Sequence, residues 1–96
     1  MDTQEILRTA RIMIVDDDDD LRQLLLTQFE REGVGALEQA ETMAAAFAKI
    51  DAFAPDILIL DVQLPDGNGF NICSRLREQG FERPIIMLTG QDGENE

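Results

Sequence analysis

The sequence predicts an α/β domain in which a parallel sheet is covered by helices on both faces. Short apolar runs alternate along the chain with segments whose apolar residues have helical spacing, a pattern typical of βαβ units. The runs 57–60 and 85–88 are apolar at every position, as expected for strands buried on both faces. Three of the predicted strands end in polar residues, which places those residues at one edge of the sheet.

The first strand is predicted at 12–15, where apolar and β-branched residues end abruptly in acid. A helix follows, defined by Leu21, Leu24, Leu25 and Phe29. Asp18 or Asp19 can cap its first turn, and Gly33 stands where a helix often ends in a glycine. This segment therefore predicts a strand, an acidic loop and a capped helix.

The second strand is predicted at 34–38, although glycine and alanine lower its β-propensity. The second helix begins at Thr42 and ends before Pro55. Its inward face is predicted to carry Met43, Phe47 and Ile50. The third strand is the apolar run 57–60.

Turn-forming residues at 64–69 precede the third helix. The apolar pattern of that helix is carried by Phe70, Cys73 and Leu76. The single cysteine suits a small buried apolar residue. The fourth strand, 85–88, is followed by Thr89 and Gly90.

Length and composition limit the possible classes of protein. A chain of 96 residues suits one domain, and we expect an N-terminal extension at 1–11 followed by the domain at 12–96. No apolar run is long enough to span a membrane or to direct secretion, so a cytoplasmic location is expected. The net charge of −12 opposes binding of this segment to nucleic acid or an anionic membrane. The absence of histidine excludes Cys–His catalysis.

Acidic residues are predicted to meet at the carboxyl edge of the sheet. Asp16 and Asp17 follow the first strand and Asp61 follows the third, so these distant residues should lie close together. Three neighbouring carboxylates repel one another unless a cation binds or one takes up a proton. Mg²⁺ prefers such oxygen ligands and can leave positions for a phosphoryl group. Each aspartate alone could be a loop acid or a cap, and only their coincidence favours a site.

The same edge predicts phosphoryl chemistry. The carboxylate of Asp61 could act as the nucleophile and form an acyl phosphate. The hydroxyl of Thr89 could then bond a phosphoryl oxygen, and Gly90 would leave space for the entering group.

Three blocks of sequence resemble the receiver domain of bacterial two-component response regulators. They are Ile-Met-Ile-Val-Asp-Asp, Pro-Asp-Ile-Leu-Ile-Leu-Asp with Leu-Pro-Asp-Gly-Asn-Gly, and Pro-Ile-Ile-Met-Leu-Thr-Gly. Their order and spacing match the family across residues 12–90. The resemblance implies a flavodoxin-like, three-layer αβα fold, with the four predicted strands in the order 2-1-3-4.

The resemblance also implies roles for individual residues. Asp61 corresponds to the phosphoacceptor, Asp16 and Asp17 to the metal-binding pair, and Thr89 to the switch hydroxyl. Gln63 stands where the family uses a backbone carbonyl as a ligand to Mg²⁺. The implied phosphoryl donor is a phosphohistidine on a sensor histidine kinase or a histidine phosphotransfer domain. Small phosphodonors are also implied, and such a receiver phosphorylates itself without being a turnover enzyme.

The family lysine after a fifth strand has no counterpart here, since the only lysine, Lys49, lies in the second predicted helix. We therefore interpret the chain as a receiver domain cut after its fourth strand, without the fifth strand and the last two helices. Such a cut would leave the strand at 85–88 on an open edge, and we expect a homodimer formed through it.

Other classes of protein remain as alternatives. A receiver fold that is not phosphorylated could serve as an interaction or dimerisation module. A phosphatase of the haloacid dehalogenase type would use Asp16 and Asp18 as its Asp-x-Asp pair, but it leaves Asp61 unexplained. A calcium-binding loop is disfavoured because Gln63 and Pro65 break the ligand pattern of an EF-hand.

Overall fold

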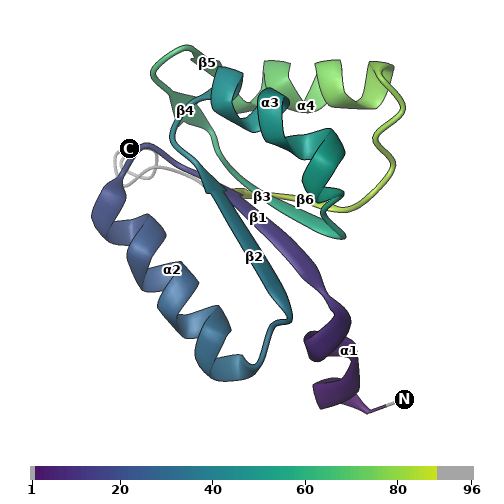
Figure 1. Cartoon of the computed structure of the whole chain (residues 1–96). Coiled ribbons are helices and arrows are strands. Elements are labelled where there is room, and N and C mark those ends of the chain that lie inside the picture. Colours follow the sequence, from purple (N-terminus) through teal and green to yellow (C-terminus); the bar gives the residue numbers. More distant parts are fainter. Residues whose placement is uncertain (1, 89–96) are drawn as a thin grey trace.

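A computed structural model describes residues 2–88 and contains a parallel sheet of four strands in the order β2-β1-β3-β6 (Figure 1). The strands are β1 (Arg11–Val15), β2 (Ala36–Ala40), β3 (Ile57–Asp61) and β6 (Ile85–Leu88). Since β6 is the fourth strand predicted from the sequence, the predicted fold class and strand order are confirmed.

Helices cover both faces of the sheet and create two apolar clusters. On one face, Ile14 and Ile59 pack beneath α2 (Asp19–Glu32). On the other, Leu58 and Leu60 pack beneath α3 (Met43–Phe53) and α4 (Gly69–Glu78). Figure 1 shows this three-layer arrangement, with α2 on one side of the sheet and α3 and α4 on the other. Within residues 2–88, no helix has the length and apolar character needed to cross a membrane.

The predicted cap of the first helix is present. The Asp18 side chain accepts a hydrogen bond from the Leu21 N–H and begins α2, which ends at Gly33 in the left-handed conformation with φ 91°. Thr42 caps α3 by accepting from the Ala45 N–H. Caps of this kind can be predicted from sequence, because each joins a side chain to a backbone N–H only three residues away.

The second strand lies two residues later than predicted, at 36–40 instead of 34–38. The N–H of Val34 closes the end of α2 by donating to the Phe29 carbonyl, and the N–H of Gly35 donates to the Leu7 carbonyl. Both donors are therefore used outside the sheet. The shift also places the polar Gln39 on the edge strand, where its side chain bonds α2.

Two of the apolar residues that defined the predicted helical patterns face solvent. Leu24 on α2 is 63% exposed and Phe70 on α4 is 59% exposed. Arg22 is buried on α2, while Ile72 and Leu76 are buried on α4. The prediction of a buried Cys73 is also imprecise, because the residue is half-buried. Helical spacing alone allowed more than one inward face, and contacts with the sheet selected between them.

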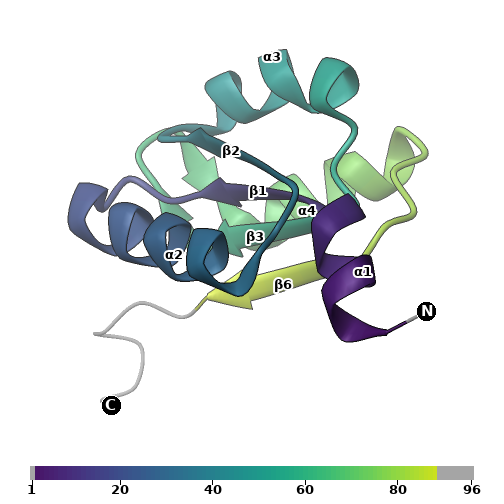
Figure 2. The same cartoon turned by 60° about the horizontal axis from the view of Figure 1, so that its bottom comes forward.

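A short hairpin and a short N-terminal helix were not predicted. The turn region forms a hairpin of β4 (Gln63–Leu64) and β5 (Gly67–Asn68). The N-terminal extension contains α1 (Thr3–Thr9), which lies at the amino ends of the strands (Figure 2). A capping box between Asp2 and Glu5 starts α1.

Gly35 allows α1 to approach the loop before β2. An added Cβ at Gly35 would lie 1.8 Å from the Arg8 carbonyl oxygen. We expect Gly35→Ala to undock α1 and to lower the free energy of unfolding by about 1–3 kcal/mol. Urea unfolding measures the loss. Faster exchange of the Ala36 N–H, which donates to the carbonyl of Ala10 just after α1, reports the undocking.

Gly33→Ala is the matched control for this substitution. Its φ of 91° strains any side chain, but no atom lies within 4 Å of an added Cβ. It should cost about 1 kcal/mol and leave α1 docked. Protection at Ala36 that is equal in the two variants would contradict the steric argument.

Candidate functional site

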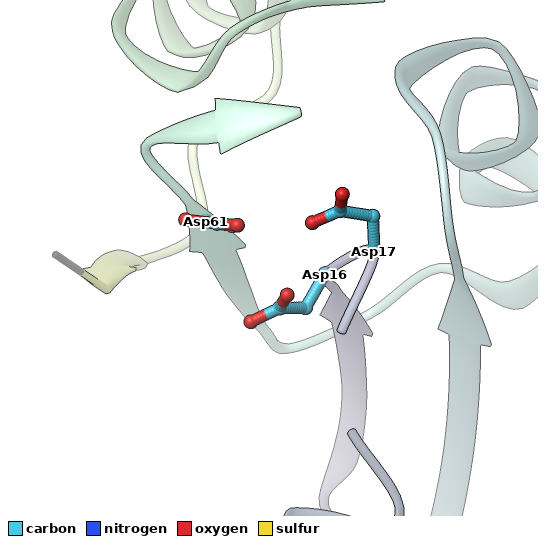
Figure 3. Close-up of side chains that lie close together, drawn as sticks. All are labelled: Asp16, Asp17 and Asp61. Atoms are coloured by element: carbon cyan, nitrogen blue, oxygen red, sulfur yellow. The ribbon is translucent and has the colours of Figure 1, made fainter. Parts of the chain in front are cut away.

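The sheet brings three predicted acidic residues to one place. Val15 on β1 pairs with Leu60 on β3, so the next residues, Asp16 and Asp61, lie beside each other at the carboxyl edge. One carboxylate oxygen from each of Asp16, Asp17 and Asp61 lies within 4.8 Å of the others. Figure 3 shows Asp16 and Asp17 projecting from the end of β1 toward Asp61. The predicted convergence of these carboxylates is therefore confirmed.

Asp16 is the most constrained member of this acidic cluster and is only 2% exposed. Its N–H donates to the Ala40 carbonyl at 3.1 Å, and its Oδ1 accepts from the Asp18 N–H at 2.9 Å. Burial raises the pKa of Asp16, and the negative charges of Asp61, Asp17 and Asp18 raise it further, against the opposing effect of the Asp18 hydrogen bond. The fold thus holds an acid in a position that disfavours its charge.

Asp17 and Asp61 complete the cluster from more open positions. Asp17 is exposed, whereas Asp61 is half-buried at the end of β3. The Asp61 Oδ1 accepts a hydrogen bond from the Gln63 N–H at 3.2 Å, which orients the carboxylate. This half-exposed carboxylate can reach both a cation and an incoming group.

Gly69 supports the end of β3 and was missed by the sequence reasoning. A Cβ on Gly69 would lie 2.4 Å from the Asp61 carbonyl oxygen, and its N–H donates to the Val62 carbonyl at 2.6 Å. The start of α4 therefore packs directly against the backbone of Asp61. The available signal is a glycine at the first position of a helical pattern, but the turn-forming residues before it favour a turn at this position.

The acidic cluster fits a hard divalent cation. It offers carboxylate oxygens, which Mg²⁺ prefers, and it is open enough to leave room for water or phosphoryl oxygens. Burial and the uncompensated negative charges of the neighbouring carboxylates also raise the pKa of Asp16. A bound cation would compensate these charges. Asp16, Asp17 and Asp61 would hold the ion.

Other predicted site residues have different positions. Gln63 is exposed on β4, and the role of its carbonyl stays a prediction. Thr89 and Gly90 lie outside the described residues, although the preceding Leu88 pairs with Asp61. Lys49 extends from α3 to the Gln39 carbonyl on β2, with an Nζ–O distance of 2.6 Å.

Asp18 does not join the acidic cluster that the structure describes, because its carboxylate caps α2. The arrangement gives no support to Asp16 and Asp18 as the catalytic pair of a phosphatase. Arg22, whose buried guanidinium bonds the Asp16 carbonyl, was also missed. An arginine within a leucine-rich helical pattern reads as an exposed residue, so the sequence offered no signal.

The fold and the acidic cluster together define a flavodoxin-like receiver. Residues 12–96 match the family model described as the response regulator receiver domain. The chain belongs to this family, the receiver domains of two-component response regulators.

Curated relatives support this assignment. The chain is 36% identical over 84 residues to the alkaline phosphatase synthesis transcriptional regulatory protein PhoP of Bacillus subtilis, covering 88% of this chain and 35% of PhoP. It is 38% identical over 82 residues to the transcriptional regulatory protein TrcR of Mycobacterium tuberculosis, covering 85% and 32% of the two chains. The chain thus spans about a third of the length of these relatives.

Solved structures agree with the family assignment. The non-phosphorylated HemR receiver domain of Leptospira biflexa superposes with a TM-score of 0.78 at 32% identity, over 86% of this chain and 66% of HemR. The MaeR response regulator bound to beryllium trifluoride gives a TM-score of 0.80 at 26% identity, over 85% and 68%.

Asp16→Asn is expected to separate folding from metal binding. The folded state binds the Asp16 proton more tightly than the unfolded chain, because the pKa of Asp16 is raised. The metal-free protein therefore loses stability as pH rises from the ordinary aspartate range, about 3.9, through the raised pKa. The substitution should remove this loss, raise metal-free stability at neutral pH and weaken Mg²⁺ binding at least about tenfold.

Urea unfolding at several pH values, with and without Mg²⁺, measures both effects. Asp20→Asn is the control, because Asp20 is exposed in the first turn of α2. Equal pH dependence for Asp16→Asn and the parent protein would contradict the proposed burial of charge.

Proposed function

We propose that this chain is a phosphoacceptor module of a two-component or phosphorelay system and takes a phosphoryl group onto Asp61. The observation that carries the proposal is the cluster of Asp16, Asp17 and Asp61 at the carboxyl edge of a receiver fold. Family membership alone would not require these residues, since a receiver fold can lose its acids. Here all three are present and close together.

The reaction is an in-line displacement at phosphorus. A carboxylate oxygen of Asp61 forms a bond to phosphorus while the bond from phosphorus to the donor breaks, and the donor leaves with the bonding electrons. The Gln63 N–H holds the Asp61 carboxylate in place. A bound Mg²⁺ would neutralise the charge on the phosphoryl oxygens. Thr89 and Gly90 are proposed to receive those oxygens.

Receiver domains act with histidine kinases, and the proposed donor is the phosphohistidine of a sensor kinase or a histidine phosphotransfer domain. Each chain would accept one phosphoryl group, so we propose that it is not a turnover enzyme. The proposed location is the cytoplasm, because relatives of this chain are transcriptional regulatory proteins. The net charge of −12 supports our proposal that this segment itself binds neither DNA nor an anionic membrane.

Acetyl phosphate with Mg²⁺ tests the phosphoacceptor directly. Intact mass spectrometry should show the addition of one phosphoryl group, lost on treatment with hydroxylamine, which cleaves acyl phosphates. Asp61→Asn should abolish the adduct because the amide is not a nucleophile of this kind. The control Asp20→Asn, which changes an exposed carboxylate outside the cluster, should retain the adduct. A folded parent protein without an adduct would favour the module that is not phosphorylated.

Self-association is a second proposed property. In the described sheet β6 pairs only with β3, and Ile86 on β6 is 49% exposed. An edge strand of this kind can pair with a second copy. Sedimentation velocity should show dimers at high micromolar concentration, and Ile86→Lys should shift the protein toward monomer. A parent protein that stays monomeric at that concentration would refute dimerisation.

A further inference from the structure

Arg22 is an unusual residue to find buried on α2. It is 5% exposed, although arginine is seldom buried without partners. Its neighbours on the inward side of the helix are apolar, with Leu25, Leu26 and Phe29 packed against the sheet. A charged side chain at such a position requires specific hydrogen bonds to offset the loss of water.

The guanidinium of Arg22 joins three separate parts of the structure. Nη1 donates to the Asp16 carbonyl at 2.7 Å, and Nε donates to Gln39 Oε1 on β2 at 2.7 Å. Nη2 donates to Asp19 Oδ1 in the first turn of α2. The planar fork of arginine can serve these acceptors simultaneously, whereas a lysine ammonium is a single point of charge.

These contacts fix the backbone of Asp16 from behind the acidic cluster. The N–H of Asp16 is held by the Ala40 carbonyl, and its carbonyl is held by Arg22. The peptide that leads into Asp17 is thereby restrained. The hydrogen bonds of Arg22 use the Asp16 carbonyl and leave the Asp16 carboxylate to the cluster.

We propose that Arg22 is a positioning residue for the divalent cation site and holds Asp16 and Asp17 in the geometry that binds the ion. This inference rests on the proposed metal site. Arg22 acts through the Asp16 backbone and touches neither the cation nor the phosphoryl group. Partners that orient metal ligands in this way commonly change metal affinity by about 10–100-fold.

Charge and positioning predict opposite results when Arg22 is replaced. Loss of a nearby positive charge would strengthen Mg²⁺ binding, because the guanidinium repels a cation. Loss of the restraint on Asp16 would weaken it. Arg22→Met removes both charge and hydrogen bonds, whereas Arg22→Lys keeps the charge but cannot join all three acceptors. Both variants should bind Mg²⁺ about tenfold more weakly than the parent protein.

Arg31→Met is the matched control. Arg31 is an exposed arginine in the last turn of the same helix, so its loss changes the net charge equally. Its Mg²⁺ affinity should stay within about twofold of the parent value, since exposed charges are screened. The two substitutions at Arg22 and this control therefore separate charge from position.

Mg²⁺ affinity is measured by NMR titration of the amide signals of Asp16, Asp17 and Asp61. The chain contains no Trp or Tyr, so intrinsic fluorescence from these residues cannot report binding. Urea unfolding of each variant gives the folded fraction, and the dissociation constant is taken for folded protein. A purely structural role would lower stability and leave that constant unchanged. If Arg22→Met does not fold, Arg22→Lys decides by the same comparison.

The results distinguish this inference from the function on which it depends. Tenfold weaker binding in folded Arg22→Lys, with unchanged binding in Arg31→Met, supports positioning by Arg22. Parent-like affinity in the folded Arg22 variants overturns the inference and leaves the metal site intact. A parent protein that shows no Mg²⁺-dependent shifts overturns both proposals.

Discussion

The parallel register of β1 and β3 is the constraint on which the site depends. It places Asp16 beside Asp61 at the end of two buried strands, and Asp17 follows directly. Burial makes the negative charge of Asp16 unfavourable, and repulsion from the neighbouring carboxylates adds to this. The acidic cluster therefore arises from the pairing of these two strands.

Burial of apolar side chains offsets the unfavourable electrostatic energy of the acidic cluster. Ile14, Leu58 and Leu60 are almost completely buried, and each such side chain contributes about 1.5–3 kcal/mol. The three residues belong to strands that end in the acidic cluster, so the packing that fixes the sheet also fixes the carboxylates. Repulsion at the edge is offset by burial a few residues away.

Contacts with the backbone of the acidic residues restrain the cluster further than the pairing of the strands alone. Gly69 lets α4 approach the Asp61 carbonyl, and Arg22 joins the Asp16 carbonyl to β2 and α2. Each contact acts on the backbone of an acidic residue. The side chains are then left for the proposed cation and phosphoryl group, in keeping with the receiver family to which the chain belongs.

The sequence by itself determined the strand cores, the caps formed by Asp18 and Thr42, and the meeting of three aspartates. These follow from local hydrogen bonds and from the rule that parallel strands share a carboxyl edge. Tertiary structure alone decided the start of β2, the exposure of Phe70 and the burial of Arg22. Those outcomes depend on which surfaces and hydrogen-bond acceptors the folded chain brings together. The periodicity of apolar residues in the sequence does not predict them.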